Sequence, residues 1–536
     1  MLFDAAGRPL STSRDIPRAS RDAGAFRGSL AGWRGPQVSG RSGMAREREV
    51  MQRRAADLLA NDWAANATVD TVTGNAVGTG LLPKPALPAE RLGITPEQAR
   101  AAATDMEWIF AAWMREADVR GRCHFFDLQT LGLRSILTMG ELLHVAVMLP
   151  EGERRACGRR FSLALQAISP TRLQTPADMS MEPLVRDGIR FTEWGRPAGY
   201  YIACPPARPG DVTMTTATLF STDFRYLPAR CGHRQNVFHL YRMEEDEQDR
   251  GISTFARAIG LFRNLSDVLH FELFAQVIAA SFPVFVATED GRLPGGVQEA
   301  FGARDRQDEP PQYLQKIEEG QIWYGEPNQK PYVLESKRPS ANFATFVEIV
   351  QRGMAAAQGI PYESLTKDFS KTNYSSMRAA LNEAWKVYNF YRQWLARDYC
   401  QPIYEMVLEE AFLRGELELP PGAPDFYEAR ELWCNADWIG PARGFIDPVK
   451  EVSATVLALE NRLMTYGEAW AQRGGDFEEG METLLLEAGL LNRVRAALPG
   501  RAAASEAAAA TPGRVGQAAT PTGDEPEQGE EENADG

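Results

Sequence analysis

The sequence has little cysteine, with six residues in 536 and no CxxC pair among them. So few cysteines in so long a chain are typical of a reducing compartment and argue against a disulfide framework. Long apolar runs are missing as well: the closest, Val277 to Ala287, is too short to span a membrane and contains Pro283. The first residues, Met1 to Asp4, contain no apolar signal core. We therefore expect a soluble protein that is made in a cytoplasm and has no membrane contact.

Catalytic motifs are also missing. The sequence contains no GxxxxGK(S/T) phosphate loop, no HExxH, no GxSxG and no GxGxxG. Its histidines and cysteines show no metal-ligand spacing, so we expect no metal and no other cofactor. Cys123 and His124, with Asp127 and His144, are the only set that suggests a Cys/His hydrolase, but adjacent side chains usually point apart. We expect a protein that is not an enzyme and keep the hydrolase as a minor alternative.

Acidic residues outnumber basic ones by 72 to 58, and the net charge is −14. Non-specific DNA affinity comes from basic side chains that neutralise phosphates, so the chain as a whole is no nucleic-acid clamp. The charge is uneven, since residues 1–54 contain eleven Arg and five acids. We expect a flexible basic arm over residues 1–45. Residues 501–536, rich in Ala, Pro and Gly and then acidic, predict a disordered tail.

The apolar periodicities between these ends indicate an α+β protein. Apolar residues at a spacing of three and four predict helices over 46–77, 95–116, 127–139 (capped by Asp127), 254–280 and 449–498. Apolar or alternating stretches predict an antiparallel set of strands over 141–149, 161–168, 188–192, 198–203 and 236–241. The segment 283–341, rich in Pro and Gly, reads as a small β-rich insert.

The stretch from residue 343 to 410 is the most strongly patterned. A helix over 343–357, with Asn342 as its cap, ends at Gly359. A polar loop follows, and a helix of some 35 residues then begins near residue 377. Its N-cap is Asn373, Ser375 or Ser376. Pro402 lies inside this helix and predicts a kink.

Five short segments carry a further signal. They are Asn61–Ala67 with Val77–Leu81; Arg250–Ser253; Arg338–Phe343; Gly359–Glu363 with Asp368–Ser370 and Asn373–Ser376; and Trp438–Pro441 with Ile446–Pro448. In these segments, and over roughly residues 46–498, the sequence resembles the lambda-family portal proteins of tailed bacteriophages. A phage, a prophage and a gene transfer agent are all compatible origins.

This resemblance implies a ring, usually of twelve copies, at one capsid vertex, which is the channel for packaging and ejecting double-stranded DNA. The implied partners are other copies of the chain, the terminase large subunit, the major capsid and scaffold proteins, a head–tail adaptor and, transiently, DNA. The implied location is the virion, with assembly in the host cytoplasm. The alternative is another virion component, such as a head–tail adaptor or a minor capsid protein.

The resemblance also implies a portal fold with named regions. These are a wing (46–250, and 377–445 with the long kinked helix), stem helices (251–282 and 342–358), a clip (283–341), a tunnel loop (359–376) and a helical crown (446–500). In the tunnel loop the implied channel residues are Lys367, Asp368, Lys371, Asn373, Tyr374 and Ser375. In the clip, Trp323 and Tyr324 are the candidate anchors for the motor. Two other readings stay open: Lys367 and Asp368 pair only with each other, and the two aromatic side chains fill the insert's own core.

Overall fold

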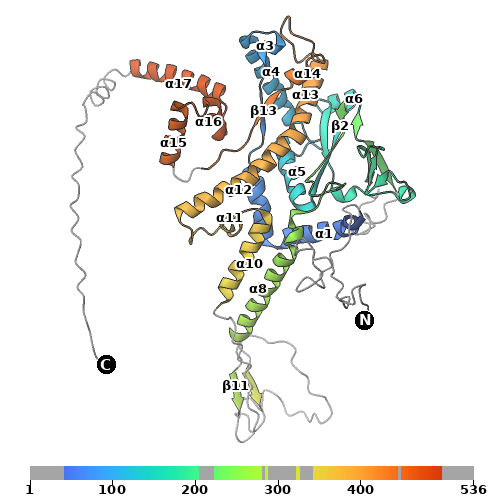
Figure 1. Ribbon diagram of the computed structural model, residues 1–536, viewed down its shortest axis with the longest axis vertical. Coiled ribbons are helices and arrows are strands. Elements are labelled where there is room, and N and C mark those ends of the chain that lie inside the picture. The colour runs from blue at the N-terminus through green and yellow to red at the C-terminus, as the bar shows by residue number, and fades with distance from the viewer. Residues whose placement is uncertain are drawn as a thin grey trace, which may run out of the picture. The chain divides into compact units, whose positions relative to one another are not determined.

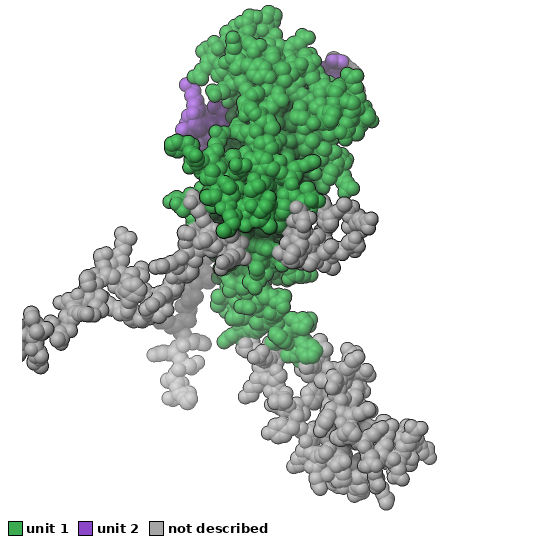
Figure 2. Space-filling model, turned by 90° about the vertical axis from the view of Figure 1, so that its right-hand side faces the viewer, with its two compact units in different colours: residues 1–446 green, residues 447–536 purple. Residues whose placement is uncertain are grey.

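The computed structural model describes residues 42–204, 223–280, 284–287, 322–325, 342–444 and 448–497. The chain divides into two compact units, Met1–Ile446 and Asp447–Gly536, shown in different colours in Figure 2. Helices and strands are both present, as the α+β class requires. Among the helices in these ranges, none combines the length and the apolar character needed to cross a membrane.

The first unit begins with two helices where the sequence predicts one. Helix α1 (Ser42–Asn61) ends before α2 (Trp63–Ala76), and Asp62 between them is extended, with φ −110° and ψ 120°. The Asp62 carboxylate accepts a hydrogen bond from the backbone N–H of Ala65, so this residue starts a new helix rather than continuing the old one. The prediction of one continuous helix over 46–77 is therefore wrong, because two helices meet at Asp62.

Two further helices follow in the chain. The short α3 (Ala89–Leu92) precedes α4 (Pro96–Met114), which is capped by Thr95 with Gln98 in a capping box. Helix α5 (Phe125–Met139) begins two residues earlier than predicted, and its N-cap is His124. Asp127 is not the cap: it occupies the third helical position and accepts a bond from the His124 N–H at 2.9 Å.

The strands form separate antiparallel sheets rather than one set. In the first sheet, β2 (Glu141–Met148) lies between β10 (Val237–Tyr241) and β3 (Leu163–Ala167). The first six residues of β2 are all buried, as expected for a strand that is covered on both faces. The second sheet has the order β4 (Val185–Arg186), β5 (Ile189–Phe191), β6 (Pro197–Ala203) and β7 (Phe224–Pro228). A small hairpin pairs β8 (Arg230–Cys231) with β9 (Arg234–Gln235). Short helical turns are α6 (Glu151–Ala156), η3 (Pro170–Arg172) and η4 (Ala177–Met179).

Two helices extend away from these sheets side by side (Figure 1). A 3-10 turn, η5 (Thr254–Arg257), is capped by Ser253 and leads into α8 (Ile259–Ala280). Helix α10 (Phe343–Gln358) returns, and the Asn342 side chain makes no capping bond. Between them, β11 (Val284–Ala287) pairs in parallel with β12 (Ile322–Gly325). The remainder of the predicted insert lies outside the described residues.

The long helix is divided into two by a π-helical segment. Helix α12 (Tyr374–Leu395) passes through η6 (Ala396–Cys400), a π-helix, into α13 (Gln401–Leu413). Pro402 lies in the first turn of α13, so the irregularity precedes the proline instead of being centred on it. Proline lacks the N–H that an α-helix would use there, and the wider π turn accommodates this loss. A short helix, α14 (Arg430–Trp433), completes the unit.

The core of the first unit is aromatic and joins segments far apart in the sequence. Phe110 and Trp113 of α4 pack with Phe125 of α5 and with Tyr404 of α13. The Trp113 indole N–H donates to the Leu163 carbonyl at 2.9 Å, so this buried polar group is satisfied. At the edge of this core, β1 (Leu82–Pro85) pairs with β13 (Ala436–Ile439).

The second unit contains α15 (Pro448–Glu460), α16 (Tyr466–Gln472) and α17 (Phe477–Ala497). The helical cluster predicted over 449–498 is therefore present. Thr465 and Glu468 form a capping box at the start of α16. Among the described side chains of this unit only Ala469 is buried.

Candidate functional site

The predicted channel loop lies between two well-fixed helix ends. Helix α10 stops at Gly359, whose left-handed φ of 69° suits glycine. Pro361 then starts a five-residue helix, α11 (Tyr362–Thr366), that the sequence analysis places inside the loop. Ile360 just before this helix and Leu365 within it are buried. Within the predicted loop, 359–376, regular structure is therefore missing only from residues 359–361 and 367–373, which together are shorter than that loop.

Lys367 is the first residue of this loop, and its side chain turns towards α2. It has a left-handed φ of 58°, which is uncommon for a residue with a Cβ atom. The Lys367 ammonium donates to the hydroxyl of Thr71, across 296 positions of sequence. The position of Lys367 was predicted, but this partner was not.

Asp368 is engaged within the loop itself. Its carboxylate accepts from the backbone N–H of Ser370 at 3.0 Å. Hydrogen bonds from Ser370 lower the pKa of Asp368, with a smaller contribution from the charge of Lys371. The bonds recorded for Lys367 and Asp368 thus lead to different partners, Thr71 and Ser370.

Lys367 and Lys371 are both exposed residues, and 74 % of the Lys371 side chain is accessible. Its ammonium lies 3.3 Å from the Glu348 carboxylate of α10. Glu348 also accepts from Arg352 at 2.7 Å, so one carboxylate serves two cations. Close by, the Thr372 hydroxyl donates to Glu363 at 3.2 Å. The far end of the loop is thereby tied to α10 and α11 through surface contacts.

Asn373 and Ser375 have local roles at the start of α12. The Asn373 side chain accepts from the Ser376 N–H at 2.8 Å, which makes it the N-cap among the three candidates. Tyr374 is the first helical residue and Ser375, which is exposed, the second. The amide oxygen of Asn373 is thus used by the helix.

Trp323 and Tyr324, the candidate anchors of the insert, occupy the middle of β12. In the parallel register they lie opposite Phe285 and Val286 of β11. Their role as anchors for a partner stays a prediction, and so does the alternative that they fill the core of the insert.

The residues of the hydrolase alternative have structural roles. The His124 ring nitrogen Nδ1 accepts from the Phe126 N–H, and burial lowers the pKa of His124. His144 is buried, its Nδ1 lies 2.7 Å from the Tyr399 hydroxyl, and burial lowers its pKa to about 3. The His124 ring therefore caps α5, and the His144 ring packs in the core against Tyr399.

A buried ion pair that the sequence did not indicate joins β2 to the segment before η5. Arg250 donates through Nε to Glu141 at 2.7 Å and through a second nitrogen to the other carboxylate oxygen. It also donates to the carbonyls of Leu173 and Asp187 at 3.0 and 2.8 Å. His239 Nε2 lies 2.8 Å from Glu141. The segment Arg250–Ser253 was singled out by resemblance, but nothing in it indicated the partner.

Arg392 of α12 is hydrogen-bonded to two other segments of the first unit. From α12 it donates to the carbonyls of Asn75 and Pro441 at 3.0 Å each, and to that of Ala76 at 3.2 Å. A Cβ on Gly440 would lie 2.7 Å from Nε of Arg392, so a larger residue there would force the Arg392 side chain to shift. The end of α2, α12 and the segment after β13 therefore meet at one guanidinium.

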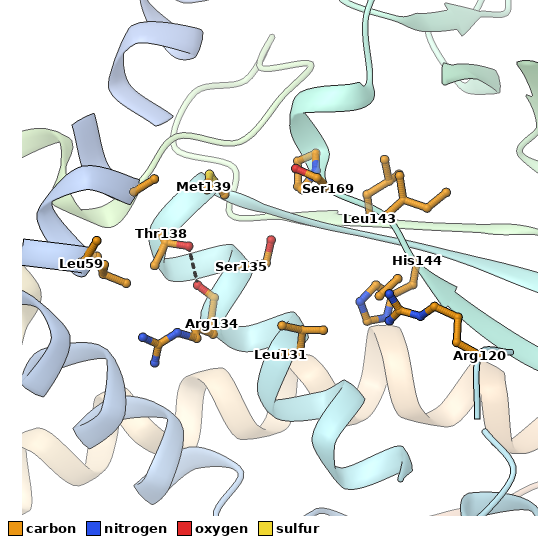
Figure 3. Close-up of a pocket in the computed structure, with 15 residues that line it drawn as sticks. Leu59, Arg120, Leu131, Arg134, Ser135, Thr138, Met139, Leu143, His144 and Ser169 are labelled. Carbon is orange, nitrogen blue, oxygen red and sulfur yellow. Dashed lines mark hydrogen bonds between the residues drawn. The ribbon is translucent and has the colours of Figure 1, made fainter. Parts of the chain in front are cut away.

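A pocket of about 470 Å³ opens between α1, α5 and β2. Figure 3 shows Leu59 of α1, Arg134 and Ser135 of α5, and His144 of β2 on its walls. Arg134 is paired with Asp70 at 2.6 Å, and Arg120 lies 3.4 Å from the buried Asp118. Both cations of the pocket are therefore already compensated.

The family of the chain is shown by its sequence. The family model described as "Phage portal protein, lambda family" matches residues 26–392, and the chain belongs to this family. It is 28 % identical over 486 residues to the portal protein of Escherichia phage N15, covering 85 % of this chain and 87 % of the relative. It is 27 % identical over 484 residues to portal protein B of Escherichia phage lambda, covering 85 % and 86 %. The resemblance seen in the sequence segments is confirmed.

Among solved structures, a chain from the virion of a native gene transfer agent particle has a TM-score of 0.38 and 15 % identity. The similarity covers 83 % of this chain and 97 % of that one. A chain from the neck of the native particle, computed with C12 symmetry, has a TM-score of 0.37 and 14 % identity, with 80 % and 94 % covered. At these values the family assignment rests on the sequence.

Proposed function

We propose that copies of this chain close into a ring at one capsid vertex, and that double-stranded DNA passes through the ring during packaging and ejection. Membership in the portal family supports this proposal. The observation that carries it is the surface of α8 and α10. These two helices pack on each other yet leave large apolar side chains exposed, namely Phe271, Leu273, Phe274, Phe346 and Ile349. Such a surface needs neighbours, and heterologous contacts between identical copies generate rings.

The mass of the purified protein tests the ring. We expect an assembly near twelve chains, and we expect Ile349→Asp to shift the population towards smaller species, because it places a charge on the apolar surface. Arg263→Ala on α8 removes only an exposed ion pair with Asp267 and serves as the control. A folded wild-type chain that stays monomeric at high concentration would contradict the ring and favour another virion component.

The loop between α11 and α12, residues 367–373, is proposed to line the channel and to contact DNA weakly. Lys371 is the strongest candidate for this contact. Its ion pair with Glu348 is exposed, and such pairs contribute only about 0–1 kcal/mol. A DNA phosphate can therefore replace Glu348 as the partner of Lys371 at little cost. In a chain of net charge −14, a contact of this kind holds the duplex briefly and lets it slide.

Lys371→Ala is expected to shorten the packaged DNA or weaken its retention, most clearly at low salt, where phosphate contacts are strongest. The measurement is the length of the packaged DNA and its retention in particles whose variant rings assemble normally. Lys386→Ala is the matched control, because Lys386 lies further along α12, is 72 % exposed and is also ion-paired, with Glu383. Filling and retention equal to wild type in Lys371→Ala rings would remove this residue from the DNA contact.

The segment 283–341 is proposed to dock the packaging motor, with Trp323 and Tyr324 as anchors. Aromatic side chains are enriched at the centres of protein interfaces, where burying them contributes much of the affinity. Rings carrying Trp323→Ala or Tyr324→Ala are expected to capture less terminase large subunit in a pull-down. Wild-type binding by variant rings of normal mass would show that the two side chains serve the insert's own packing.

A further inference from the structure

The Lys367 side chain ends on a hydrogen-bonded chain inside the protein. Its ammonium donates to the Thr71 hydroxyl, and that hydroxyl donates its only proton to the Ala67 carbonyl at 2.7 Å. Thr71 is a residue of α2 and only 7 % exposed. A hydroxyl that has already given its proton can only accept, and an ammonium group can only donate. The two groups are therefore complementary, and a phosphate would have to displace a partly buried bond.

The backbone at Lys367 depends on the same contact. A φ of 58° is rare for a residue with a Cβ atom, and such conformations persist where surrounding contacts hold them. Lys367 also ends α11, so its conformation sets the direction in which the loop leaves that helix. The bond to α2 fixes this departure point.

The two loop lysines are thus held in different ways. Lys371, whose side chain is 74 % accessible, reaches the Glu348 carboxylate, which is 22 % accessible and also pairs with Arg352. Lys367 reaches a buried hydroxyl on another part of the first unit. The first contact exchanges readily with solvent ions, and the second does not.

From this difference we infer that Lys367 is a positioning residue: its ammonium fastens the start of the loop to Thr71 of α2, and it does not contact DNA. This inference rests on the proposed channel role of the loop and deepens it. It assigns the weak DNA contact to Lys371, which Lys367 holds in place from four residues away.

Hydrogen exchange on the purified full-length protein without DNA tests the attachment. The reporters are the amides of Asp368, Ser370 and Thr372, which are hydrogen-bonded within the loop. We expect Lys367→Met and Thr71→Val each to speed their exchange about tenfold, as loss of a bond to a charged group implies. The double variant is expected to exchange no faster than Lys367→Met. Thr73→Val is the control, since Thr73 is 5 % exposed on the same helix and donates to the Val69 carbonyl in the same way.

Exchange in Thr71→Val that matches Thr73→Val would overturn the inference. So would a packaging assay in which Lys367→Met alters DNA retention and Thr71→Val does not, because Thr71 can act only through Lys367. The expected result is the same retention defect in both variants. Failure of the proposed function is a separate outcome: a wild-type chain that forms no ring would still show whether the loop is fastened to α2.

Discussion

Arg250→Met is expected to lower the free energy of unfolding of the first unit by about 3–5 kcal/mol, the cost of leaving one member of a buried ion pair alone. The Glu141 side chain is fully buried and Arg250 nearly so. Methionine fills similar space without charge, so the carboxylate would keep only His239 and Gln52 as side-chain partners. The loss is therefore electrostatic and not a loss of packing.

Urea unfolding followed by tryptophan fluorescence measures this effect. Arg257→Met is the control, because Arg257 is 68 % exposed and its pair with Glu244 is of the surface kind. We expect the control to change stability by less than about 1 kcal/mol. A similar small change in Arg250→Met would mean that the buried pair contributes nothing net to the folded state.

The same pair gives the stability a defined pH dependence. Burial alone would raise the pKa of Glu141, but Arg250 and His239 outweigh it and hold the pKa well below its ordinary value. A carboxyl with a lowered folded pKa contributes stability above its unfolded pKa of about 4.3, and this stability is lost as the pH falls towards the folded value. In Arg250→Met, burial prevails and the Glu141 pKa rises, so the deficit against wild type should shrink on acidification.

Gly140→Ala is the second substitution with a large expected effect, a loss of about 3 kcal/mol from strain and overpacking together. Gly140 has a φ of 90°, and a Cβ there would lie 2.4 Å from the carbonyl carbon of Ile252. Backbone atoms cannot rotate away as a flexible side chain can. The junction of α5 and β2 must therefore move away from the segment that leads into η5.

Gly152→Ala is the control for Gly140→Ala, because it is the same substitution at a position without steric conflict. Gly152 lies in α6 with open space around its Cβ position, and alanine favours helix by up to about 1 kcal/mol over glycine. Thermal unfolding should show a lower midpoint for Gly140→Ala and an unchanged or slightly higher one for Gly152→Ala. Equal midpoints for wild type and Gly140→Ala would show that the junction can relax.

Periodicity and capping signals predicted the long elements well and their interruptions poorly. Helix α4, strand β2 and helix α10 lie close to their predicted ranges, because the two helices have a clear apolar period and the strand is a nearly continuous apolar run. The break at Asp62 was missed because the residues on both sides favour helix. Pro402 predicted an interruption of the long helix, but the sequence does not say whether the backbone responds with a kink or with a wider π turn.

The helix ends that bound the loop could be predicted from the sequence, but the partners of its side chains could not. Gly359 and Asn373 mark the two helix ends, and both are visible in sequence. The bond from Lys367 to Thr71 spans 296 residues and leaves no local signal. The same holds for Arg250 with Glu141, which are 109 residues apart. A charged residue that becomes buried needs a polar or oppositely charged partner, but the sequence does not identify that partner when it lies far away along the chain.

The pairing of β1 with β13 has a consequence for how the protein is made. Lys84 lies opposite Asp437 in this ladder, so the first unit cannot close until about 350 further residues have been synthesised. At roughly 5–20 residues per second, this interval is on the order of 20–70 s. During that time the aromatic side chains of α4 and α5 lack Tyr399 and Tyr404, which cover them in the finished fold. The nascent chain therefore emerges from the ribosome with its central apolar surface open for most of its synthesis.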